Sequence, residues 1–403
     1  MAQKSDWRGL FAVVLLVIAS VMSLAATDLI LPAVPELPEA LGGSLSQAQL
    51  VLAAFALGNG CGLLLFGHLG ARYDQRLIFE RSLLVFAALS LLATQAPNLS
   101  TLIGLRFFQG LSAAAAPVFA PGMIRVLFSP QGALRAIGML GSLASLAPAL
   151  APVLGVWILA AFGWSGSFAV VGLIAVVLAL CARGLHGVFP ELVAEAAAGS
   201  YLRLLRNPVY LRYALSQAFN LGGLLVFVFG APTVITRSMG GSIYDFIIMQ
   251  ITGISSFIIA ANLAARLAER FGPERVIVLG TLLSAVGAGS IAGYGVLGGS
   301  STLILTLLFL PMNLGLGFRG PPGFYRAVLA AEGDDARGSA LLLVSVLLIA
   351  ASGTAFVAPW IVQGLKPLSL TAAALVGSAV IILQVLPRLA ESATTDVADV
   401  EQD

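Results

Sequence analysis

The stretches that decide the fold are Leu69-Gly70-Ala71-Arg72-Tyr73-Asp74-Gln75-Arg76 and Leu267-Ala268-Glu269-Arg270-Phe271-Gly272-Pro273-Glu274-Arg275. Each is a short charged connection between two long apolar runs; the first follows the second run of the chain, and the second follows the eighth. Similar loops at equivalent places indicate an internal repeat. The sequence therefore predicts two halves of six helices each, in parallel orientation.

The composition is that of an integral membrane protein. Of the 403 residues, 59% are hydrophobic and 10% are charged, whereas about 25% of the residues of a soluble domain are charged. A hydrocarbon core about 30 Å thick needs roughly 20 apolar residues per helix, so the chain has room for about a dozen crossings. An all-α protein with twelve transmembrane helices is predicted, over residues 9–32, 47–69, 77–96, 101–124, 134–160, 164–184, 211–232, 244–266, 275–294, 301–319, 338–360 and 368–387.

Positive charge is distributed unevenly between the two sets of connections. If the N-terminus is cytoplasmic, the outside segments hold only Arg237 and Lys366, and the other basic residues collect inside or well within a span. The positive-inside rule then places both termini in the cytoplasm. The expected location is a bacterial-type inner membrane. The expected divisions are an N-terminal half (1–185), a cytoplasmic linker (186–210), a C-terminal half (211–388) and an acidic cytoplasmic tail (389–403).

Two charged residues lie within apolar runs. Asp28 is the only acidic residue of the first run, and Arg106 lies well inside the fourth. A charge at bilayer depth is costly unless it faces a cavity or a partner, so both are functional candidates. Their similar depth permits contact, and a carboxylate that leaves and rejoins an arginine can exchange a proton. The competing interpretation is a static ion pair that fixes helix packing.

Polar side chains within other spans have two interpretations. An amide there either contacts a substrate or bonds to a neighbouring helix, and an aromatic ring either lines an apolar pocket or faces lipid. The candidates for substrate contact are Gln109, Gln217, Asn220, Tyr244, Gln250 and Asn313.

Prolines and further arginines have structural interpretations. Pro148 and Pro152, one turn apart among small residues, predict a bent and closely packed fifth helix. Arg125, Arg319 and Arg326 are expected to anchor helix ends at the membrane surface, because long arginine side chains reach the interface.

Four motifs resemble those of one transporter family. Residues 67–76 resemble the loop signature between the second and third helices of the major facilitator superfamily. Arg106-Phe107-Phe108-Gln109-Gly110 resembles the fourth-helix motif of its drug/proton antiporters, and residues 147–155 resemble their Pro- and Gly-rich fifth-helix motif. Residues 27–33, Thr-Asp-Leu-Ile-Leu-Pro-Ala, are similar to the end of the first helix in Bcr/CflA-type exporters. The resemblance covers essentially the whole chain and is closest to the Bcr/CflA-type and MdfA-type multidrug exporters.

The resemblance implies the major facilitator fold and assigns roles to the matching residues. It implies proton coupling at Asp28 and Arg106. The first loop departs from the pattern, because Ala71 occupies its acidic position and Asp74 its glycine position, and this puts the usual gating contact of that half in doubt. The residues that the resemblance gives to gating and helix packing are Gly67, Arg72, Arg76, Pro148, Pro152, Gly155, Glu269 and Arg270.

These features predict a secondary transporter and not an enzyme. The sequence has no metal-ligand spacing and no glycine-rich nucleotide loop, so no metal, cofactor or nucleic acid is expected and the energy has to come from an ion gradient. The leading prediction is a monomer that exports hydrophobic or cationic small molecules across the lipid bilayer in exchange for protons, by alternating access. The alternatives are transport of one specific metabolite on the same fold, in either direction, and a non-transporting receptor or scaffold.

Overall fold

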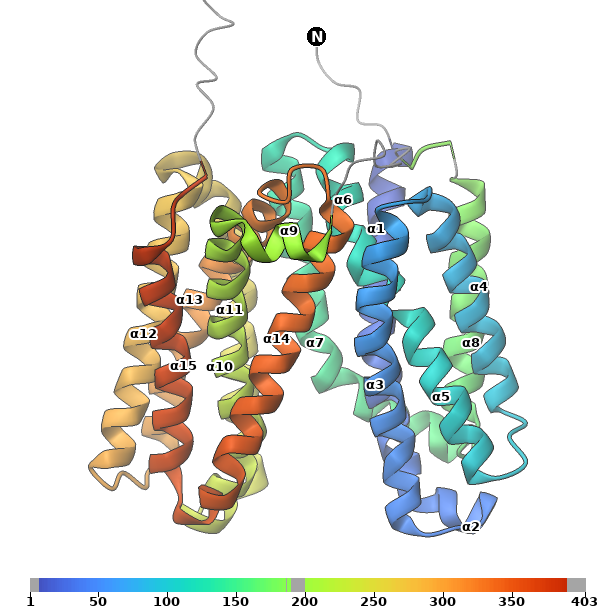
Figure 1. The fold of residues 1–403 in the computed structure, drawn as a ribbon. Coiled ribbons are helices and arrows are strands. Elements are labelled where there is room, and N and C mark those ends of the chain that lie inside the picture. The colour runs from blue at the N-terminus through green and yellow to red at the C-terminus, as the bar shows by residue number, and fades with distance from the viewer. Residues whose placement is uncertain (1–6, 186, 190–199, 390–403) are drawn as a thin grey trace, which may run out of the picture.

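The computed structural model describes residues 7–185, 187–189 and 200–389, and these residues form helices and connecting turns without a strand. The long helices stand in two groups (Figure 1). The first group consists of α1 (Trp7–Asp28), α2 (Leu37–Leu41), α3 (Leu45–Gly70), α4 (Gln75–Ala93), α5 (Leu99–Ala113), α6 (Ala115–Leu127), α7 (Pro130–Phe162) and α8 (Gly166–Gly184). The second group consists of α10 (Pro208–Ser238), α11 (Ile243–Phe271), α12 (Pro273–Val296), α13 (Thr302–Leu329), α14 (Asp335–Val357) and α15 (Leu365–Val385). The short α9 (Tyr201–Arg206) precedes the second group, and the 3-10 helices η1 (Leu31–Glu36) and η2 (Ala358–Gln363) follow α1 and α14.

The helices are long and apolar enough for a multi-pass membrane protein. In the described part of the chain, ten helical segments meet the length and composition that a membrane crossing needs, with α5 and α6 counted as one. Two further long helices are not among these ten: α4, which carries charged residues in its first two turns, and the 33-residue α7. The predicted count of twelve is consistent with this set. Residues 186 and 190–199 of the predicted linker and 390–403 of the predicted tail lie outside the described residues; the rest of the linker includes α9 and the first residues of α10.

The two similar loops make the same turn by different means. Asp74 caps α4, because its carboxylate accepts the backbone N–H of Arg76 at 3.0 Å and also binds that residue's guanidinium. Gly272 instead separates α11 from α12 with a φ of 83°, a left-handed conformation that suits glycine. The first loop thus makes its turn with a side-chain cap, whereas the second makes it with a left-handed glycine. This accounts for Asp74 at the position where the motif has glycine.

The two groups meet mainly through α3 with α14 and α7 with α11, and further through α6 with α14 and α7 with α13. Small residues permit the approach: a Cβ at Gly67 would lie 2.6 Å from that of Ala340, and one at Gly138 would lie 2.9 Å from the carbonyl oxygen of Ala261. These contacts lie toward the end of the molecule that carries the α3–α4 loop (71–74) and the α13–α14 loop (330–334), at the top of Figure 1. We call it the arginine end; the sequence predicts it to be cytoplasmic.

Candidate functional site

Arg106 is completely buried inside the first group. Its Nε donates to the carbonyl oxygen of Val51 on α3 at 3.3 Å, and one terminal nitrogen donates to Oε1 of Gln109 at 2.7 Å. The guanidinium carbon lies 4.1 Å from the ring centre of Phe55, in the geometry of a cation–π contact. The other terminal nitrogen has no hydrogen-bond partner among the described residues. The arginine is thus held by neutral groups and a ring.

Gln109 links this arginine to α4. Its amide nitrogen donates to Oγ of Ser90 at 2.6 Å, and that hydroxyl donates to the carbonyl oxygen of Phe86 at 2.6 Å. Both ends of the Gln109 amide are therefore used inside the first group. Gln109 therefore bonds to a neighbouring helix. This is one of the two interpretations that the sequence allowed, and the other was contact with a substrate.

Asp28 is the last residue of α1 and is half-buried. Within the described residues it has no ion-pair partner within 4.0 Å, so the structure does not bring it into contact with Arg106. The next residue is fixed from two sides. The carbonyl oxygen of Leu29 accepts a hydrogen bond from Oγ of Ser167 on α8 at 3.0 Å, and a Cβ at Gly155 on α7 would collide with the same oxygen. The helix end is held while the carboxylate stays available.

The polar candidates of the second group are spread over several environments. Oε1 of Gln217 and both polar side-chain atoms of Asn220 are buried without a hydrogen-bond partner among the described residues. Asn313 donates to the carbonyl oxygen of Phe309 in its own helix at 3.0 Å. Gln250 is half-buried, and Tyr244 is 73% exposed. In the described structure no hydrogen bond joins any of these side chains to Asp28 or Arg106.

Arg319 is a buried cation that the sequence interpretation missed. The prediction of a helix-end anchor is wrong, because α13 continues to Leu329 and Arg319 is completely buried inside the second group. One terminal nitrogen donates to the carbonyl oxygen of Ser216 at 2.6 Å and the other to its Oγ at 3.0 Å. A Cβ at Gly280 would lie 3.0 Å from the backbone nitrogen of Arg319, so that glycine lets the helices approach.

Each group has a buried arginine on its fourth long helix, although the two arginines are not at equivalent positions of the repeat. Arg106 lies on the fourth long helix of the first group, and Arg319 lies on the fourth long helix of the second. Each is buried, each donates to a backbone carbonyl of a neighbouring helix, and neither has a carboxylate within 4.0 Å in the described structure. A search for embedded charges that compared the two halves would have found both.

Two ion pairs join the groups at the arginine end. Nε of Arg125 on α6 lies 2.9 Å from Oδ2 of Asp335 on α14, and the side chains are 24% and 6% exposed. A terminal nitrogen of Arg135 on α7 lies 3.1 Å from Oε1 of Glu269 on α11, in a more exposed pair. Arg125 therefore bridges the groups instead of anchoring a helix end, and the anchor prediction also fails for Arg326, which is buried. We call the two pairs together the clamp.

The α9 segment adds a neutral contact to the clamp. Tyr201 donates its hydroxyl to the carbonyl oxygen of Leu64 on α3 at 2.6 Å, and its oxygen also lies where a Cβ at Gly67 would be. Burial raises the pKa of Tyr201 to about 12, so the phenol keeps its proton and remains a donor at neutral pH.

The remaining motif residues have separate positions. Arg72 is exposed, while Arg76 is bound to Asp74 and Arg270 lies over the ring of Phe271 at 5.3 Å. Ala71, at the acidic position of the first loop, is buried and supplies no charge; the carboxylate that pairs across this junction is Asp335 on α14. Pro148 and Pro152 fall within α7, but their side chains lie outside the described ones.

Comparisons with known proteins agree with this architecture. The profile of the Major Facilitator Superfamily matches residues 16–353. A chloramphenicol resistance protein of Pseudomonas aeruginosa is 28% identical over 288 residues, which cover 70% of this chain and 68% of the relative. A bicyclomycin resistance protein homolog of Haemophilus influenzae is 27% identical over 310 residues, or 75% of each chain. The multidrug transporter MdfA of Edwardsiella ictaluri is 27% identical over 319 residues, covering 77% of this chain and 75% of the relative.

Solved structures share the fold at low sequence identity. The transporter FucP in its outward conformation superposes with a TM-score of 0.72 at 17% identity, covering 95% of this chain and 100% of that one. A bacterial homologue of the iron transporter ferroportin, in an outward-facing state, gives 0.72 at 15% identity, covering 92% and 98%. The family profile spans most of the sequence and the fold agrees with it, so the chain belongs to the Major Facilitator Superfamily.

Proposed function

We propose that this protein exports hydrophobic or cationic small molecules from the cytoplasm in exchange for protons, by alternating access between two six-helix halves (1–185 and 211–388). The names of the relatives from P. aeruginosa, H. influenzae and E. ictaluri, which refer to antibiotic resistance and multidrug transport, support export of drug-like compounds. The charge bias of the loops supports a bacterial inner membrane with both termini in the cytoplasm.

The observation that carries the proposal is the state of Asp28. It is the only acid in the first long helix, it is half-buried, and it has no ion-pair partner within 4.0 Å in the described structure. A carboxylate with no fixed partner can hold either a proton or a cationic group of a substrate, but not both. Competition at one carboxylate couples the two movements: a proton arriving from outside neutralises Asp28 and favours release of the substrate.

Arg106 has a different part in this scheme. Its contacts with Val51 and Gln109 satisfy two of its nitrogens in this state, and one terminal nitrogen remains without a partner. We infer that Asp28 approaches this free nitrogen when α1 shifts against α5 within the first half during the transport cycle. The arginine then stabilises the ionised carboxylate and promotes release of the proton on the cytoplasmic side.

Opening and closing of the clamp switch the side of the membrane from which the site is accessible. This conformation is joined at the arginine end by Arg125 with Asp335 and by Arg135 with Glu269. For the substrate to enter from the cytoplasm, both pairs have to separate. The accessible polar candidates for substrate contact in the second half are Gln250 and Tyr244, whereas Gln217, Asn220 and Asn313 are buried within that half.

Proton-coupled transport in inverted membrane vesicles tests the proposal. The compared proteins are the wild type, Asp28→Asn, and Glu39→Gln, which removes an exposed acid from α2, just beyond the same end of α1. The probes are chloramphenicol and a fluorescent lipophilic cation, with an entrapped pH reporter. We expect substrate-dependent proton movement in the wild type and in Glu39→Gln, and none in Asp28→Asn.

Two outcomes would contradict the proposal. Full proton-coupled transport by Asp28→Asn would remove Asp28 from the coupling step. Absence of proton movement with every probe in all three proteins would instead favour transport of one specific metabolite, which a single saturable substrate would reveal.

A further inference from the structure

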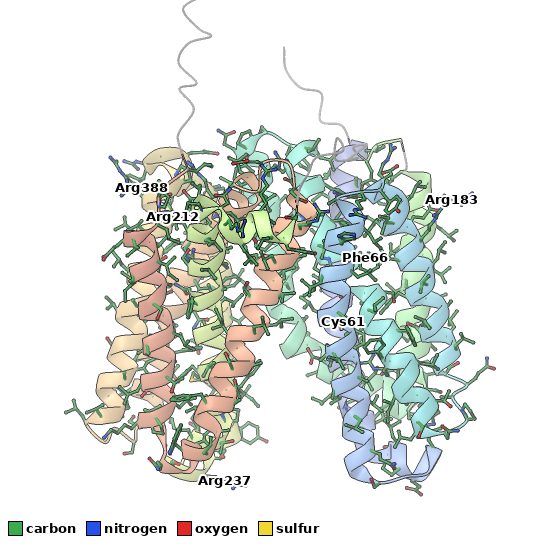
Figure 2. All side chains as sticks on the ribbon, in the orientation of Figure 1. Cys61, Phe66, Arg183, Arg212, Arg237 and Arg388 are labelled. Atoms are coloured by element: carbon green, nitrogen blue, oxygen red, sulfur yellow. The ribbon has the colours of Figure 1, made fainter. Side chains whose placement is uncertain are left out.

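Two clefts lie on opposite flanks of the molecule, both at the arginine end. The first cleft encloses about 320 Å³ and is lined by Leu77, Glu80 and Arg81 of α4 and by Arg183 of α8. The second encloses about 500 Å³ between α10, α12 and α15. Figure 2 shows Arg183 on one flank, and Arg212 and Arg388 on the other. The second cleft combines polar side chains, among them Arg212, Gln384 and Arg388, with an apolar wall that includes Val278, Leu282 and Val380.

The clefts are related by the internal repeat. The first lies between the third and sixth long helices of its group, α4 and α8, and the second lies mainly between the corresponding helices α12 and α15. When the two similar loops are aligned with Leu69 on Leu267, Glu80 falls at the position of Val278, and each of these residues lines its cleft. Each half therefore has a cleft at the same place in the repeated fold.

Each cleft contains positive charge that the protein does not neutralise. In the first cleft, Glu80 pairs with Arg183 at 3.2 Å, the Arg183 side chain is 76% exposed, and the exposed Arg81 has no ion pair in the described structure. In the second, Glu274 is occupied by Arg212 and by the hydroxyl of Tyr213.

Arg388 is the more exposed cation of the second cleft, and it forms a long ion pair with Glu274, which Arg212 already binds. Its Nε is 3.8 Å from Glu274, beyond hydrogen-bond distance, and its side chain is 71% exposed. Two arginines line each cleft, and one glutamate is the carboxylate partner there: Glu80 in the first, and Glu274, beside the lining, in the second. One positive charge in each cleft is therefore left for a ligand.

The surroundings of the clefts are suited to lipid. The helices α4, α8, α12 and α15 pack against helices of their own group, at the outer sides of the molecule (Figure 1). Large apolar side chains on these helices are exposed, as membrane-facing residues would be. Examples are Leu173, Leu180, Leu279 and Val286, each more than 60% exposed.

We propose that each cleft binds the phosphate headgroup of an anionic phospholipid, whose acyl chains run along the outer faces of α4 and α8 or of α12 and α15. Basic pockets between transmembrane helices on the cytoplasmic side have the chemistry that recognises such headgroups. Arginine contacts the phosphate through paired N–H donors, while the apolar wall below accepts the first methylene groups.

Native mass spectrometry of the full-length protein in detergent, titrated with cardiolipin or phosphatidylglycerol, tests the proposal. The variants are Arg81→Gln with Arg183→Gln for the first cleft and Arg388→Gln for the second. The matched control is Arg237→Gln, an exposed arginine at the opposite end of the molecule, which Figure 2 labels. Since one basic residue near a membrane surface contributes about 1 kcal/mol, we expect about a fivefold loss of affinity per arginine removed. Arg183→Lys and Arg388→Lys keep the charge but lose the paired donors, so their affinity should fall between those of the wild type and the glutamine variants.

The outcomes distinguish a lipid site from a simple anion site and from a loss of folding. Loss of anionic lipid in the cleft variants, with binding kept in Arg237→Gln, supports the proposal. Equal loss in Arg237→Gln, or unchanged binding in both cleft variants, would overturn it. Inorganic phosphate at matched ionic strength should not displace the lipid; displacement would mean that the clefts are simple anion sites and would also overturn it. Because the substituted side chains are exposed, thermal unfolding without lipid should be unchanged, which distinguishes lost binding from lost folding.

Discussion

Arg125→Gln should open the arginine end. The substitution removes the cation from Asp335, whose side chain is only 6% exposed, and leaves a shorter, neutral polar side chain in its place. A buried carboxylate without its cation is unfavourable, and the halves can relieve this by separating so that water reaches Asp335. The state closed at the arginine end should therefore lose population to the state open at that end.

The structure sets the size of the effect. Breaking a buried pair costs about 3–5 kcal/mol and breaking a surface pair about 0–1 kcal/mol, so a pair that is 24% and 6% exposed should contribute about 2 kcal/mol. This corresponds to a change of about 30-fold in the ratio of the two states. The pair of Arg135 with Glu269, at 62% and 36% exposed, supplies the matched control: Arg135→Gln should change the ratio by about fivefold at most.

The ratio can be measured from distances between spin labels at exposed positions of the arginine end. Tyr73→Cys in the first half and Arg266→Cys in the second provide the label sites, in a background with Cys61→Ser and Cys181→Ser. We expect Arg125→Gln to enrich the longer distance much more than Arg135→Gln does. An equal or smaller shift in Arg125→Gln would refute the argument that burial makes this pair the stronger half of the clamp.

Two further predictions concern the helices around Asp28 and Arg106. Gly155→Val should lower the midpoint of thermal unfolding in detergent by several degrees, or prevent folding, because its Cβ would collide with the carbonyl oxygen of Leu29; Gly104→Ala, which meets nothing within 4 Å, should leave the midpoint nearly unchanged. Gln109→Leu should destabilise the protein by about 2 kcal/mol, since it leaves the buried Arg106 without its side-chain acceptor, whereas Gln109→Glu should restore an acceptor; similar midpoints for Gln109→Leu and wild type would contradict this.

The repeat, the apolar runs and the motifs were sufficient to predict the fold. They failed where helices extend beyond the apolar run: the span that ends at 319 in the sequence continues to Leu329, and for this reason Arg319 was interpreted as an interface anchor and not as a buried cation. Hydropathy detects the segment that lipid can accept, but it does not detect a helix that continues among other helices after its composition becomes polar.

The candidate site was only partly predictable for a related reason. Asp28 and Arg106 stand out because embedded charge is rare, and their roles remain predictions. Gln109 lies one turn beyond Arg106 in the same helix, and this contact follows from their spacing. The other partners, Val51 and Phe55, lie on α3, and no spacing in the sequence encodes how α3 packs against α5. Likewise, Ala71 showed that a gating acid was missing, but only the structure shows that Asp335, far along the chain, meets Arg125.

The polarity of the clamp has a consequence for how the halves recognise each other. In both ion pairs the first half supplies the arginine and the second half supplies the carboxylate. Two copies of the first half placed face to face would set arginine against arginine, and two copies of the second would set acid against acid. The two halves repeat one architecture, but the surfaces through which they close carry opposite charges. Each half can therefore close against the other half and not against a second copy of itself.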